Sequence, residues 1–104
     1  MNIELLVIPN CPNEAATVDL IATAVADTRV RATITRTVIA SQDQARLRGF
    51  TGSPTILLDG KDPFARPGAA VGLACRLYST ADGLRGLPAL PDLRQALKRV
   101  AAAG

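Results

Sequence analysis

Histidine and tryptophan are absent from this chain, and aromatic side chains of any kind are scarce. Without an imidazole the chain cannot form Ser–His or Cys–His nucleophilic sites, and the usual zinc centres lose a common ligand. Two phenylalanines and one tyrosine are also too few for the stacking surface that binds single-stranded nucleic acid. We therefore expect no nucleic-acid partner, no metal centre and no bound cofactor.

Long apolar runs are also missing, so no segment is expected to cross a membrane. The first residues lack the basic stretch, apolar run and cleavage site of a signal peptide, and we expect a cytoplasmic protein. In that compartment the two cysteines are not expected to form a purely structural disulfide. The net charge of +3 comes from basic residues scattered among acidic ones, which indicates a solvated surface or, alternatively, a weak preference for anions.

The length predicts a single α/β domain over residues 1–104. The hydrophobic spacing predicts the order β-α-β-α-β-β-α. The expected strands are 3–8, 30–39, 55–58 and 73–78, and the expected helices are 13–26, 41–49 and 91–102. Ser41 and Gln44 have the spacing of a capping box at the start of the second helix. A proline- and glycine-rich stretch, residues 61–72, precedes the fourth strand.

Cys11 is the first candidate for chemistry, because it lies where the first strand gives way to a helix. Unpaired backbone N–H groups and the positive end of the helix dipole favour a thiolate there, the form that attacks electrophiles. Glu14 lies one helical turn further on, and like-charge repulsion would raise the pKa of the thiol. The residues do not decide which effect is larger.

The element order, with Cys11 after the first strand and Gly52-Ser53-Pro54-Thr55 ahead of the third, resembles the thioredoxin-like fold. The resemblance implies a four-stranded mixed sheet of order 2-1-3-4 with helices on both faces. It also implies a cis peptide bond before Pro54. The backbone of Ser53 would then flank the sulfur of Cys11 and hold an extended substrate segment. Ser53, Pro54 and Pro12 are accordingly the expected substrate-binding residues.

The chain departs from the Cys-x-x-Cys motif of that family, because Glu14 replaces the second cysteine. An exposed Cys11 would form a mixed disulfide but has no local thiol to resolve it. Cys75 is the other candidate, either as a small buried apolar residue or as a resolving or metal-sharing thiol. In the standard fold the two sulfurs would lie roughly 10 Å apart, across two strand spacings. A disulfide needs Cα atoms within about 7 Å, so residues 61–72 would have to bend the site closed.

A narrower resemblance is to small actinobacterial thioredoxin-like proteins often labelled alkylmercury lyase. It is carried by Cys11-Pro12-Asn13, by the stretch from Gly52 to Phe64 and by Cys75-Arg76 with Tyr78. Organomercurial lyase uses two cysteines and one carboxylate, and Cys11, Cys75 and Glu14 supply that set here. Thiolates are soft ligands that suit mercury.

Three functions therefore stay open, and whether the chain is an enzyme stays open with them. In the first, Cys11 is a nucleophile in thiol–disulfide exchange or thiol capture, with Cys75 as resolver and a thiol-containing protein or small molecule as partner. In the second, the thiols bind a soft metal or an organomercurial. In the third, the domain is a non-catalytic thioredoxin-like interaction domain and its thiol is vestigial.

Overall fold

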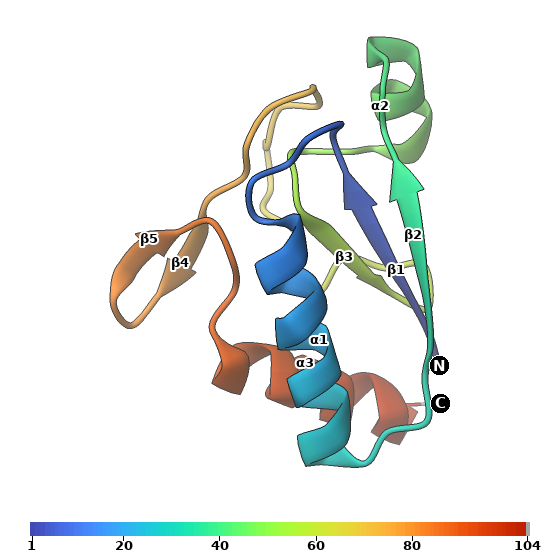
Figure 1. Ribbon diagram of the computed structural model, residues 1–104, viewed down its shortest axis with the longest axis vertical. Helices are drawn as coiled ribbons and strands as arrows, with labels where there is room; N and C mark the ends of the chain where they lie inside the picture. The colour runs from blue at the N-terminus through green and yellow to red at the C-terminus, as the bar shows by residue number, and fades with distance from the viewer. Residues whose placement is uncertain (104) are drawn as a thin grey trace.

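The computed structural model describes residues 1–103, in which a three-stranded mixed sheet carries helices on both faces (Figure 1). Its elements are β1 (Asn2–Val7), α1 (Glu14–Thr28), β2 (Thr33–Val38), α2 (Gln42–Arg48), β3 (Thr55–Leu58), β4 (Tyr78–Thr80), β5 (Gly83–Arg85) and α3 (Leu90–Ala103). The central strand β1 runs parallel to β2 and antiparallel to β3. Within the described residues, no helix is both long and apolar enough to span a bilayer.

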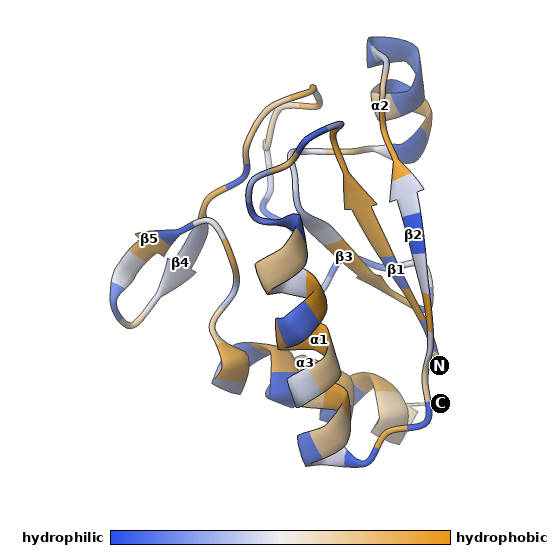
Figure 2. Cartoon of the chain, in the orientation of Figure 1, coloured by the Kyte–Doolittle hydropathy of each residue, from blue (hydrophilic) through white to orange (hydrophobic). Residues whose placement is uncertain are grey.

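The core has two parts because β1 is apolar on both faces. Ile3, Leu5 and Val7 pack with α1 and α3 on one face, while Leu6 packs with α2 on the other. A strand buried on both faces is typical of a sheet between helical layers. Figure 2 shows apolar residues concentrated on β1, whereas the edge strand β2 is mostly polar. The sheet therefore holds β1 rigidly, and the turn that follows β1 carries Cys11.

Several local predictions are confirmed. β3 has the expected bounds, and the capping box at α2 is complete. Ser41 Oγ accepts a hydrogen bond from the backbone N–H of Gln44 at 3.1 Å, and the Gln44 side chain accepts one from the backbone N–H of Ser41 at 3.1 Å. Gly49 follows α2 with a φ of 60°, a left-handed conformation that glycine adopts readily. These features depend on neighbouring residues alone, and so they are readable from the sequence.

The predicted fourth strand is wrong, and with it the four-stranded sheet of order 2-1-3-4. Residues 73–77 contain no strand, and β4 begins at Tyr78 and pairs antiparallel with β5 in a separate two-stranded sheet. The backbone of this segment forms one isolated parallel bridge with the rest of the molecule, between Ser53 and Cys75. Because this bridge lies ahead of β3, no hydrogen-bond ladder forms along Thr55–Leu58 on that side.

Candidate functional site

Cys11 lies in the turn between β1 and α1, and only 8% of the residue is exposed. Pro9 and Asn10 are exposed, and Asn10 has a φ of 58°, in the left-handed region that asparagine tolerates. The turn returns Cys11 to the apolar cluster of β1, α1 and α3. The prediction of an exposed thiol at this position is therefore wrong, and Cys11 packs as a small apolar side chain.

Glu14 is the first residue of α1, and its carboxylate is bound to Arg36 on β2. Arg36 Nη2 donates to Glu14 Oε1 at 3.1 Å, and Arg36 Nε donates to Oε2. The hydrogen bonds from this guanidinium hold the pKa of Glu14 below its ordinary value. Pro12, which the resemblance implies as a substrate-binding residue, is exposed. Glu14 is thus an anion paired with Arg36 on β2. It is not the neutral carboxyl group that could donate a proton in a lyase reaction.

Ser53 is the point at which the two cysteine-bearing segments meet, and it is fully buried. Its hydroxyl accepts a hydrogen bond from the backbone N–H of Ile8 at 3.1 Å. Its own N–H donates to the carbonyl of Ala74 at 2.8 Å, and its carbonyl accepts from the N–H of Arg76 at 2.9 Å. Residues 74–76 therefore occupy the backbone groups that the resemblance reserves for a substrate segment.

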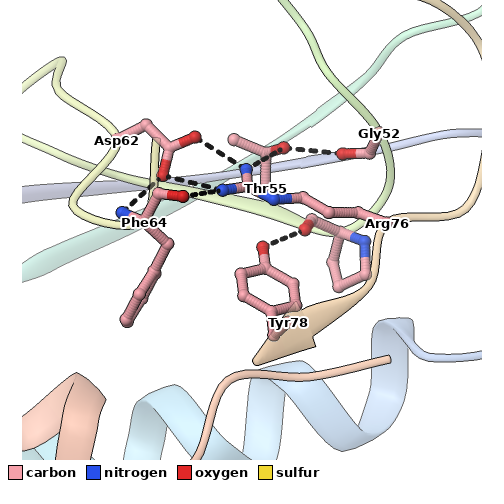
Figure 3. Close-up of polar contacts among 7 residues, drawn as sticks. Gly52, Thr55, Asp62, Phe64, Arg76 and Tyr78 are labelled. Carbon is pink, nitrogen blue, oxygen red and sulfur yellow. Dashed lines mark hydrogen bonds and ion pairs between the residues drawn. The ribbon is translucent and has the colours of Figure 1, made fainter. Parts of the chain in front are cut away.

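Pro54 is buried as well, and the Ser53–Pro54 peptide bond is cis, as expected. The carbonyl of Pro54 accepts a hydrogen bond from the hydroxyl of Tyr78 (Figure 3). Burial raises the pKa of Tyr78, so the phenol keeps the proton that it donates. The Tyr78 ring packs edge-on against Phe64, with ring centroids 5.6 Å apart. The expected substrate contacts at Ser53 and Pro54 are therefore filled by the protein's own residues.

Cys75 is exposed and free, so it is not the buried apolar residue that one interpretation of the sequence expects. It borders a hollow of about 240 Å³. The residues that line this hollow are Thr51, Arg66, Ala69, Cys75, Arg76 and Leu77. The Ser53–Cys75 bridge fixes its backbone against the main body of the protein. Of the two thiols, Cys75 is the one that a reagent in solution reaches first.

Arg76 is the residue that the sequence analysis missed, and it is 7% exposed. Its guanidinium binds both carboxylate oxygens of Asp62, with Nη1–Oδ2 at 2.6 Å and Nη2–Oδ1 at 3.3 Å. It also donates to Thr55 Oγ1 at 3.1 Å and to the carbonyl of Phe64 at 2.7 Å (Figure 3). The centroid of the Tyr78 ring lies 4.6 Å from the guanidinium carbon, in the geometry of a cation–π contact. The sequence does not predict this cluster from any local pattern, because its members are separated by turns and come together only in the folded chain.

The structure does not gather Cys11, Cys75 and Glu14. Across residues 1–103 there is no group of three cysteine, aspartate or glutamate side chains placed to share a metal ion. Cys11 is in the core, Cys75 faces solvent, and Glu14 is paired with Arg36. A lyase-like site built from these three residues would require the turn, the helix start and the 74–76 segment to move together.

Comparison of the chain with protein-family models, with curated proteins and with solved structures finds no match. The thioredoxin-like and alkylmercury-lyase-like resemblances therefore remain predictions that rest on the residues quoted for them.

Proposed function

We propose that this chain is a thioredoxin-like thiol protein that reacts with a disulfide R–S–S–R. One RS group of that molecule then stays bonded to Cys75 as a mixed disulfide. The observation that carries the proposal is the opposite burial of the two free cysteines, with Cys75 exposed and Cys11 in the core. Thiolate chemistry requires access of the reagent to sulfur, and Cys75 has that access at the edge of a hollow. The proposal keeps thiol capture from the sequence analysis and moves the reactive position from Cys11 to Cys75.

The chemistry is one exchange step with a disulfide R–S–S–R, supplied by a small molecule or a protein. The Cys75 thiol loses a proton to solvent, and its thiolate attacks one sulfur of the disulfide. A bond forms between the Cys75 sulfur and that sulfur while the original disulfide bond breaks. The departing thiolate takes up a proton and leaves as R–SH. A second exchange by Cys11 would need a sulfur within bonding geometry, whereas Cys11 is enclosed by core side chains. Capture without turnover is therefore the expected outcome.

The test is incubation of the reduced, folded protein with bis(2-hydroxyethyl) disulfide, an uncharged reagent, followed by intact-mass measurement and peptide mapping. We expect one 2-mercaptoethanol group, attached to Cys75. The Cys11→Ser variant should give the same adduct, and the Cys75→Ser variant should give none under the same conditions. A first adduct on Cys11, or equal labelling of both variants, would overturn the assignment to Cys75.

A further inference from the structure

Residues 75–78 alternate between two environments. Arg76 and Tyr78 point into the protein and are buried, while Cys75 and Leu77 between them are exposed. Side chains of an extended segment point alternately to opposite sides, so the inward position of Arg76 dictates the outward position of its neighbours. Anything that holds the Arg76 side chain inside therefore also holds the Cys75 thiol outside.

The Arg76 side chain is held by a set of contacts that converge on one end of it (Figure 3). Asp62 binds the guanidinium in the two-pronged arrangement that gives arginine–carboxylate pairs their fixed geometry. Thr55 Oγ1 accepts a further hydrogen bond from Nη1, and the carbonyl of Phe64 accepts one from Nη2. Among the described residues no buried side-chain nitrogen or oxygen lacks a partner, so this ion pair is fully compensated. Removing one member would leave a buried charge without its partner, which is far more costly than losing an exposed pair.

We infer that the Asp62–Arg76 ion pair, named here the latch, positions Cys75 away from Cys11 and so determines which disulfide the protein forms. The inference rests on the proposed function and deepens it. With the latch closed, Cys75 reacts with an external disulfide and keeps the adduct. With the latch open, residues 74–76 turn, and the Cys11 thiolate attacks the Cys75 sulfur of the mixed disulfide. The Cys11–Cys75 bond then forms, the captured group leaves as R–S⁻, and it takes up a proton equivalent to the one that Cys11 lost.

The rest of the segment offers little resistance to such a turn. Between Leu58 and Tyr78 there is neither a helix nor a strand. Apart from the latch, residues 72–76 are tied to the body by three backbone hydrogen bonds, from Gly72 to Phe50 and on either side of Ser53, and by the bonds from the Arg76 guanidinium to Thr55 and to the carbonyl of Phe64. Ser53 also contacts Ile8, three residues before Cys11, so the segment lies beside the strand that leads into the Cys11 turn. The position of the Cys75 thiol thus depends on the orientation of one short segment.

The test measures the internal disulfide in Asp62→Asn and in Arg76→Lys after the same treatment with bis(2-hydroxyethyl) disulfide. Asp27→Asn is the matched control, because it breaks the exposed Asp27–Arg94 pair by the same substitution. We expect the ratio of internal disulfide to adduct to rise by about tenfold or more in both latch variants and to stay unchanged in the control. Thr55→Val keeps the side-chain shape and removes two hydrogen bonds, the one that Thr55 Oγ1 accepts from the guanidinium and the one that it donates to the carbonyl of Gly52. It should give a smaller rise in the same direction.

The outcomes separate the latch from the proposed function. If the wild-type protein forms no Cys75 adduct, the proposed function fails, whatever the variants do. If the wild type forms the adduct and folded latch variants keep the wild-type ratio, the latch is refuted while thiol capture stands. Circular dichroism identifies which variants are folded, and where the ion-pair variants are not, an unchanged ratio in folded Thr55→Val refutes the latch.

Discussion

Replacement of Ser53 by alanine tests the junction that joins the two cysteine-bearing segments. The substitution removes the hydroxyl that accepts the Ile8 N–H at 3.1 Å, and leaves both backbone hydrogen bonds of Ser53 to Ala74 and Arg76 in place. Ser53 is fully buried and Ile8 is half-buried, so water replaces the lost acceptor only in part. A buried N–H left without a partner costs about 1–3 kcal/mol, and the partial exposure of Ile8 puts our expectation at about 1–2 kcal/mol.

The assay is urea unfolding followed by circular dichroism, with midpoint and slope fitted separately. We expect a lower midpoint at an unchanged slope, because the variant changes stability without changing the surface exposed on unfolding. In a domain of this size, each kcal/mol lost from the free energy of unfolding lowers the melting temperature by about 4–8 °C. Ser79→Ala, at an exposed position of β4, is the control and should change stability by less than about 0.5 kcal/mol.

Two results would refute the reasoning about Ser53. A loss no larger than that of Ser79→Ala would mean that the Ser53 hydroxyl does not support the end of β1. A Cys75 that becomes unreactive toward bis(2-hydroxyethyl) disulfide in Ser53→Ala would mean that its position depends on the hydroxyl and not on the backbone bridge. We expect the reactivity to be retained, since the bridge uses only the backbone of Ser53.

Two further predictions concern acid stability and backbone crowding. Hydrogen bonding from Arg48 lowers the pKa of Glu4 from its ordinary 4.5 in the folded protein, so the urea midpoint should fall as the pH drops below that value. Glu4→Gln should make the urea midpoint less dependent on pH. A pH profile identical to that of the wild type would contradict the role of Glu4. Gly52→Ala places a Cβ 2.8 Å from the Cβ of Arg76 at a φ of 130°, and should cost about 1–3 kcal/mol beyond Gly68→Ala, whose Cβ meets open space at a φ of 77°. Equal losses in urea unfolding would exclude crowding.

Local signals in the sequence predict most elements of the fold. The apolar run of β1, the Ser41–Gln44 capping box and the turn residues that close β3 each act within a few residues, and the structure confirms them. The cis bond before Pro54 is also as expected. The bounds of β2 and α1 differ by a few residues because the ends of elements depend on packing as well as on propensity.

The region after β3 could not be predicted in the same way, because its hydrophobic pattern predicts burial of the residues that the structure exposes. Val71, Leu73, Cys75 and Leu77 alternate in the manner of a strand that buries its apolar side. The structure exposes this set and buries Arg76 and Tyr78 instead. Burial of an arginine is favourable only when a carboxylate and hydrogen-bond acceptors lie beside its guanidinium. Asp62 and Thr55 provide these groups from distant parts of the chain. A non-local ion pair therefore overrides the hydrophobic pattern.

The sequence pointed to individual candidate residues and not to their arrangement. Cys11, Glu14 and Ser53 lie near the ends of the expected elements, and Cys75 lies inside the expected fourth strand. Cys11 is buried directly after a left-handed turn at Asn10, and Cys75 is exposed directly before the inward Arg76 side chain. Neither consequence is visible without the packing of residues far apart in the sequence.

The most direct test of thiol capture at Cys75 is the identity of the first disulfide formed when the reduced protein reacts with a small disulfide. Intact-mass measurement with peptide mapping reads it in one experiment. We predict a single mixed disulfide on Cys75, with Cys11 still a free thiol. A wild-type protein that forms a Cys11–Cys75 disulfide, or that is modified first on Cys11, would contradict it.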